Sequence, residues 1–229
     1  MGRDKVREES YALLMKKHTH LFRVVLLSIL GLAIGFGIAL YSKKEGSLPP
    51  SQDQSSSHIL AATSIGGPFS LVDQDGQPRT EKDYADKFKL MYFGFTYCPA
   101  ICPTELSKMS EAYLSLPEEM QQKLQPIFIT IDPERDTPTV IKGYVNLFMP
   151  QLVGLTGSVD QIESVKKSFK VYAAKVSEGD GSDPEDYTMD HSSMIYLLDP
   201  AGQTVGLFKT ADTSEDIKAR LMDVLAPKN

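Results

Sequence analysis

The stretch YFGFTYCPAICPTEL, Tyr92 to Leu106, joins an apolar run to the start of a helix and contains both cysteines of the chain. Its first residues end a run whose length and composition are typical of a buried strand. Pro103 is favoured at the first position of a helix, so Cys102 is predicted to be the N-cap and Cys98 to lie on the preceding turn. Open α/β sheets place their chemistry directly after such a strand. The stretch therefore predicts an α/β fold with both thiols at the carboxyl end of a strand.

The rest of the chain alternates strand-like and helix-like segments. Strands are predicted on both sides of a turn at Asp75-Gly76, and at 89–96, 126–131, 152–155, 171–176, 193–199 and 204–209. Helices are predicted at 103–124 with an interruption at Pro117, at 138–148 after Thr137, from Ser158 with Gln161 completing a capping box, and at 214–225. A hairpin at each end of a βαβ centre indicates an α/β sandwich with a mixed sheet.

The N-terminal part of the chain differs in composition from the rest. Residues 24–41 carry no charged side chain over about 27 Å of helix, which predicts one transmembrane helix. A cleaved signal peptide is the alternative, but the apolar run exceeds the usual length of about 7 to 15 residues and no A-x-A site follows it. Basic residues are more numerous before the run, which predicts that residues 1–23 are cytoplasmic. Residues 42–60 are predicted to be a flexible linker to a domain at 61–229.

This topology places the domain outside the cytoplasm. A single-pass protein of the bacterial inner membrane with a periplasmic domain is favoured, because the acidic residues near the N-terminus are unlike a transit peptide. The mitochondrial inner membrane, with the domain in the intermembrane space, is the alternative. The chain has a net charge of −6 and its acidic excess follows the apolar run. We therefore expect no nucleic acid among its partners.

The two cysteines have three candidate roles: a structural disulfide, a redox pair, or two ligands of a metal. A disulfide would close a five-residue loop and stabilise the fold by roughly 2 kcal/mol, against about 4.7 for a hundred-residue loop. Three residues separate Cys98 from Cys102, which misses the two-residue spacing of the thioredoxin motif. Near the positive end of a helix dipole, both thiols are expected to favour the thiolate. A metal would need further ligands.

His191 is the one histidine that falls in the predicted folded domain. It follows the predicted loop at 178–190 and directly precedes the predicted strand at 193–199, a position at the sheet edge that the loop could bring over a metal. Two thiolates and an imidazole suit Cu(I) well and Cu(II) less strictly, whereas zinc would require a fourth ligand or an open position. The segment 178–190 carries six carboxylates. It is either a solvated loop or a lid that moves His191 toward and away from a metal.

Three motifs in this order, FGFTYCPAICPTEL, DPERDTP (132–138) and DHSSMIYLLDPAG (190–202), resemble the Sco/SenC family of copper-binding proteins. The resemblance covers residues 66 to 229 and implies a thioredoxin-like, peroxiredoxin-related fold. It implies copper ligation by Cys98, Cys102 and His191. It also implies a role in maturing the dinuclear copper centre in subunit II of cytochrome c oxidase.

Two further positions take a meaning from the resemblance. Asp132 and Asp136 of the second motif would lie close to the metal, and Asp132 is a candidate outer partner or weak Cu(II) ligand. An aspartate at a strand end is also a common turn former. Ala100 departs from the family, because many members carry an acidic residue between the cysteines. We expect this change to tune the electrostatics at the thiolates without removing copper ligation.

Two functions are compatible with these residues. The first is a metallochaperone that passes Cu(I) to the oxidase by ligand exchange, with another periplasmic copper carrier as a candidate donor. The second is a thiol-disulfide oxidoreductase in which Cys98 and Cys102 keep the oxidase cysteines reduced, with a thiol reductase as a candidate partner. A copper or redox sensor is a third hypothesis. His191 discriminates between the first two, because disulfide reduction does not obviously need it.

Overall fold

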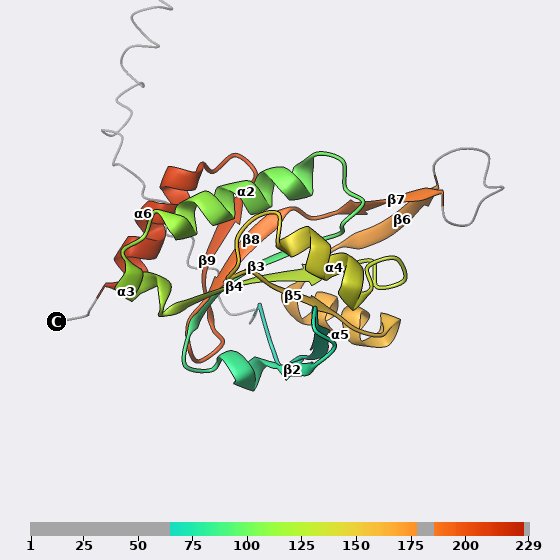
Figure 1. Cartoon of the computed structure of the whole chain (residues 1–229), viewed down its shortest axis with the longest axis horizontal. Coiled ribbons are helices and arrows are strands. Elements are labelled where there is room, and N and C mark those ends of the chain that lie inside the picture. The colour runs from blue at the N-terminus through green and yellow to red at the C-terminus, as the bar shows by residue number, and fades with distance from the viewer. Residues whose placement is uncertain (1–64, 178–185, 227–229) are drawn as a thin grey trace, which may run out of the picture. The chain divides into compact units, whose positions relative to one another are not determined.

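A computed structural model describes residues 65–177 and 186–226 of the chain. Its main sheet has seven strands in the order β2-β1-β5-β4-β3-β8-β9 (Figure 1). These strands are β1 (Ser70–Asp73), β2 (Pro78–Thr80), β3 (Phe88–Gly94), β4 (Leu124–Thr130), β5 (Val153–Thr156), β8 (Met194–Leu198) and β9 (Thr204–Lys209). Strands β3, β4 and β5 are parallel, and their neighbours β1 and β8 run antiparallel to them. The predicted mixed sheet is confirmed.

Helices cover both faces of this sheet. They are η1 (Glu81–Tyr84), α2 (Ile101–Leu114), α3 (Glu118–Gln121), α4 (Pro138–Val145), α5 (Val159–Phe169) and α6 (Ser214–Leu225). Helices α2, α4 and α6 lie on one face and α5 on the other (Figure 1). On the α5 face, the Phe93 ring lies 5.2 Å from that of Phe169 and 5.6 Å from that of Tyr196. Burial of both faces explains why the central strands are unbroken apolar runs.

The predicted helix starts are confirmed where a capping side chain marks them. Ser158 and Gln161 form the expected capping box of α5, and Thr137 accepts a hydrogen bond from the backbone of Val140 at the start of α4. The helix predicted at 103–124 is interrupted at Pro117, as expected, but it begins at Ile101 and ends before β4. Helix α4 also ends earlier than predicted, at Val145, because the N–H groups of Leu147 and Phe148 bond to carbonyls three residues back and not four.

A second, two-stranded sheet consists of β6 (Ala173–Ser177) and β7 (Tyr187–His191). The strands are antiparallel, and Ala173 pairs with His191. The prediction of a loop through residue 190 is therefore wrong for its last four residues, which are extended because β6 offers them a pairing partner. Residues 178–185, the rest of that predicted loop, lie outside the described residues.

The predicted transmembrane helix at 24–41 and the linker at 42–60 also lie outside the described residues. Within the described part of the chain, no helix has both the length and the apolar character needed to span a bilayer.

Candidate metal centre

The turn between β3 and α2 holds the two cysteines. Cys98 donates its backbone N–H to the Phe95 carbonyl, and the N–H of Cys102 donates to Cys98 Sγ at 3.3 Å. Cys102 is the second residue of α2, so the prediction that it is the N-cap is wrong. The first four N–H groups of a helix have no partner within it, so Pro103 fits the third position as well as the first. The Cys98 thiol takes the place of a capping side chain.

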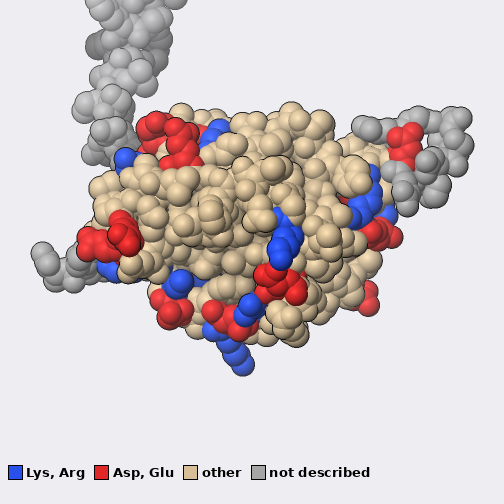
Figure 2. Space-filling model, in the orientation of Figure 1, with Lys and Arg blue, Asp and Glu red and all other residues tan. Residues whose placement is uncertain are grey.

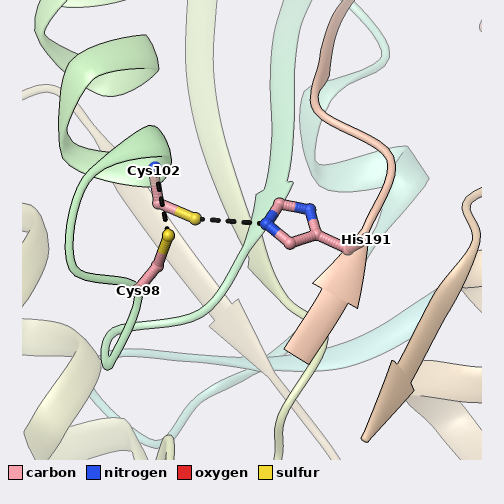
Figure 3. Close-up of side chains that lie close together, drawn as sticks. All are labelled: Cys98, Cys102 and His191. Atoms are coloured by element: carbon pink, nitrogen blue, oxygen red, sulfur yellow. Dashed lines mark hydrogen bonds between the residues drawn. The ribbon is translucent and has the colours of Figure 1, made fainter. Parts of the chain in front are cut away.

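His191 reaches the same turn from the end of β7 (Figure 3). Its Nε2 lies 3.5 Å from Cys102 Sγ, and its Nδ1 lies 3.0 Å from the Ser192 carbonyl oxygen. A carbonyl only accepts, so the neutral imidazole carries its proton on Nδ1 and presents the Nε2 lone pair to the sulfur atoms. The Phe95 ring packs edge-on against the imidazole, with 5.7 Å between the two ring centroids.

The three side chains form a compact set of ligand atoms. The two Sγ atoms and a ring nitrogen of His191 lie within 4.8 Å of one another. Within residues 65–177 and 186–226, no other group of three His, Cys, Asp or Glu side chains is arranged in this way. The structure therefore brings together all three residues singled out as candidate ligands, although 89 positions separate Cys102 from His191.

The two thiols differ in their electrostatics. A hydrogen bond from the Cys102 thiol lowers the pKa of Cys98 to about 3 against the effect of partial burial, and two backbone N–H groups lower it further. The pKa of Cys102 is raised, because its proton is held by the Cys98 sulfur and its side chain is fully buried. The prediction that both thiols favour the thiolate is confirmed for Cys98 and wrong for Cys102.

Comparison with known proteins points to the same family as the three sequence motifs. The family model described as SCO1/SenC matches residues 58–226. The chain belongs to the SCO1/SenC family. SCO2 of Saccharomyces cerevisiae, a mitochondrial protein, is 41% identical over 167 residues, which cover 73% of this chain and 55% of the yeast protein. The chain therefore spans about half the length of this relative.

Two solved structures of Sco proteins resemble the described domain. ScoI of Bradyrhizobium japonicum with copper bound is 44% identical and matches with a TM-score of 0.61 over 69% of this chain and 98% of ScoI. BsSco, a Sco family cytochrome c oxidase assembly protein with a disulfide switch, is 26% identical, with a TM-score of 0.55 over 72% of this chain and 95% of its own. The thioredoxin-like fold class predicted for the domain is confirmed.

In this Sco protein, the two aspartates of the DPERDTP motif form hydrogen bonds with residues next to the candidate site. Asp136 is fully buried and accepts hydrogen bonds from the Thr96 N–H at 3.1 Å and from the hydroxyls of Thr96 and Thr130, each at 2.5 Å. Burial raises the pKa of Asp136 despite these donors. Asp132 accepts from Arg135 Nε at 2.6 Å and from the Tyr187 hydroxyl at 2.7 Å. Neither carboxylate belongs to the Cys98, Cys102 and His191 set.

Several supporting residues were not anticipated from the sequence. Tyr92 is fully buried, and its hydroxyl contacts the Cys102 thiol and lies 3.0 Å from the Ser193 hydroxyl. Arg135 is part of the DPERDTP motif, and this position is the sequence signal for its role. Ala100 is exposed, and its backbone N–H contributes to the lowered pKa of Cys98.

Proposed function

We propose that this protein is a copper chaperone that binds Cu(I) through Cys98, Cys102 and His191. The observation that carries the proposal is the convergence of two sulfurs and one imidazole nitrogen within 4.8 Å. Thiolate and imidazole are ligands that suit Cu(I). Membership in a family that includes ScoI of Bradyrhizobium japonicum, solved with copper bound, supports the same conclusion.

The unequal burial of the ligands suits uptake and release of a cargo ion. Cys98 and His191 are partly exposed, whereas Cys102 is fully buried. An incoming thiolate from a partner would meet copper on the exposed side and displace Cys98 or His191 before Cys102. Cys102 gives up its proton when copper binds, since the thiolate is the metal-binding species. Transfer then proceeds by stepwise ligand exchange.

The receiving partner we propose is the dinuclear copper centre of cytochrome c oxidase subunit II. BsSco belongs to a family of oxidase assembly proteins, which supports the oxidase as the partner. Tyr97 precedes Cys98 and Ile101 precedes Cys102, and their side chains are 62% and 45% exposed, so the rim of the site offers apolar contact area. The surface between α2 and α4 is also largely uncharged (Figure 2). Such a rim favours docking of a folded protein over capture of free ions alone.

The test is a Cu(I) competition titration of the reduced full-length chain against a chromophoric chelator. We expect one Cu(I) per chain, loss of tight binding in Cys98→Ser and Cys102→Ser, and a weakening of roughly 10-fold or more in His191→Ala. His58→Ala is the matched control, because the sequence places His58 in the predicted linker. Unchanged stoichiometry and affinity in the double Cys→Ser protein would show that the proposed site is wrong.

A second candidate function is favoured by the contrast between the two thiols. The Cys98 thiolate could attack a disulfide of the oxidase, forming a mixed disulfide and releasing one partner thiolate. Cys102 would then give up its proton and attack the Cys98 sulfur, which releases the second partner thiol and leaves a Cys98–Cys102 disulfide. Two electrons pass to the partner, and an external dithiol must restore the pair. His191→Ala separates the two functions, because it should weaken copper binding while thiol exchange persists.

We also propose that residues 24–41 anchor the protein in a membrane, with the folded domain in the periplasm. The absence of charge over this segment is the support from the chain itself. Related Sco proteins include a Bacillus anthracis lipoprotein, which supports association with a membrane. Resistance to alkaline carbonate extraction, together with protease access to the domain in spheroplasts, would be the expected result. Release of the protein by carbonate would exclude the anchor.

A further inference from the structure

Arg135 lies between two tyrosine rings that belong to distant parts of the chain. The carbon at the centre of its guanidinium is 3.6 Å from the centroid of the Tyr187 ring and 4.7 Å from that of Tyr97. Only 12% of the Arg135 side chain is exposed. Guanidinium groups stack well on aromatic faces, and the attraction strengthens when water is excluded.

The same side chain is part of a closed set of hydrogen bonds. Arg135 Nε donates to Asp132 Oδ2 at 2.6 Å, and Nη1 donates to the Tyr187 carbonyl at 2.8 Å. The Tyr187 hydroxyl donates to the other oxygen of Asp132 at 2.7 Å. Tyr187 is thus held by its ring, its carbonyl and its hydroxyl at once.

These contacts join the two halves of the metal site. Tyr97 directly precedes Cys98, while Tyr187 begins the strand β7 that ends at His191. Strand β7 pairs with β6 in a sheet of only two strands, and such hairpins are marginally stable by themselves. Four residues of strand span roughly 13 Å, so a clamp at Tyr187 limits the directions in which His191 can move.

A purely local role for Arg135 explains only part of this geometry. An ion pair with Asp132 three residues away is common in turns, and by itself it would account for the contact of Nε. It does not account for the bond to the Tyr187 carbonyl or for the stacking on Tyr97. We propose that Arg135 is a positioning residue that ties strand β7 to the cysteine turn and so holds His191 within bonding range of Cys98 and Cys102. The structural link between β7 and the cysteine turn does not depend on copper, whereas its effect on copper binding rests on the proposed function.

The first test needs no copper. Hydrogen exchange is measured by mass spectrometry on the metal-free, reduced full-length chain, comparing wild type, Arg135→Gln and Arg135→Lys. We expect peptides covering 187–192 to exchange roughly 10-fold faster in Arg135→Gln, with β3 and β4 unchanged. Arg135→Lys should fall between, because a lysine keeps the charge but lacks the planar fork.

Arg220→Gln is the matched control. Arg220 also pairs with an acid three residues away, Asp223 at 2.8 Å, and also donates to a backbone carbonyl, that of Val205 at 3.1 Å. It lies on α6 and is not stacked between two rings. Exchange in 187–192 that is the same in Arg135→Gln as in Arg220→Gln would overturn the proposal.

The second test follows the ligand itself. In Arg135→Gln loaded with Cu(I), we expect X-ray absorption to show two sulfur ligands with a weakened imidazole contribution, and the affinity to fall roughly 10-fold. Full imidazole ligation and wild-type affinity would overturn the positioning role. If Arg135→Gln fails to fold, Tyr97→Leu serves instead, because this exposed ring can be removed without emptying the core. If wild type binds no copper, the proposed function fails and the hydrogen-exchange comparison alone decides on the clamp.

Discussion

Gly94→Ala should damage both the fold and the metal site, and the structure gives the size of the effect. A Cβ on Gly94 would lie 2.8 Å from Cys102 Sγ and 2.9 Å from a ring carbon of Tyr92. Non-bonded carbon contacts are normally about 3.5 to 4.0 Å, so both neighbours would have to shift by more than about 0.6 Å. Both side chains are fully buried, which leaves them little room.

The expected loss follows from two opposing effects. Overpacking a well-filled core costs about 1 to 3 kcal/mol, whereas replacing glycine by alanine in a compatible backbone gains about 0.4 to 1 kcal/mol. We therefore expect Gly94→Ala to lower the free energy of unfolding by about 1 to 2 kcal/mol. Displacement of Cys102 Sγ should also weaken Cu(I) binding.

Two other strand glycines provide controls. At Gly206 a Cβ would meet Leu197 Cβ at 3.4 Å, an ordinary contact, so Gly206→Ala should be neutral or slightly stabilising. At Gly154 a Cβ would overlap Ile141 Cγ2, so Gly154→Ala should destabilise the fold but leave Cu(I) affinity unchanged. Urea unfolding followed by circular dichroism gives the stabilities, and chelator competition gives the affinities. The reasoning is refuted if Gly94→Ala matches Gly206→Ala in both measurements.

Three further outcomes are expected. The pKa of Cys98, lowered to about 3, predicts that its alkylation rate in the reduced protein stays nearly constant from pH 5 to 8. The alkylation rate of an ordinary thiol rises about 10-fold per pH unit below its pKa. A rise of that size for Cys98 would contradict the thiolate assignment. Asp136→Ala should lower the free energy of unfolding by about 3 kcal/mol, because three hydrogen-bond donors lose their buried acceptor. A loss below about 1 kcal/mol in urea unfolding would contradict the role of Asp136 as a stabilising acceptor. Tyr92→Phe should lower the free energy of unfolding by about 1 kcal/mol and shift the Cys98–Cys102 reduction potential, because the Tyr92 hydroxyl contacts both the Cys102 thiol and Ser193. An unchanged potential would show that the contact with Cys102 has no effect on the redox pair.

Much of the fold could be predicted because the signals are local. Ser158 with Gln161, Thr137 before Pro138, and the start of α6 at Ser214 are each set by a side chain that satisfies a nearby backbone N–H. The apolar runs of β3 and β4 are equally local, since strands buried on both faces need no polar alternation. These features do not depend on the rest of the chain, so the sequence alone is enough to find them.

The errors arose where a partner distant in sequence or a neighbouring thiol decides the outcome. Residues 187–190 were expected to be loop, yet they form a strand because β6 pairs with them. Tyr187 and Thr188 favour strands and could have signalled it. Cys102 was expected to share the thiolate character of Cys98. The helix dipole acts on both thiols, but the hydrogen bond to the Cys98 sulfur, together with full burial, raises the pKa of Cys102 and keeps it protonated.

The DPERDTP motif shows why a resemblance can identify a site without explaining it. The resemblance places Asp132 and Asp136 near the metal, but the two carboxylates form hydrogen bonds with different parts of the fold. Asp136 binds Thr96 on the cysteine turn, whereas Asp132, with Arg135, binds Tyr187 on the strand that carries His191. A single turn between β4 and α4 therefore holds the cysteine pair on one side and the histidine strand on the other. On this geometry the motif links the cysteine turn to the strand that ends at His191, which gives its two acids a structural role outside the Cys98, Cys102 and His191 set.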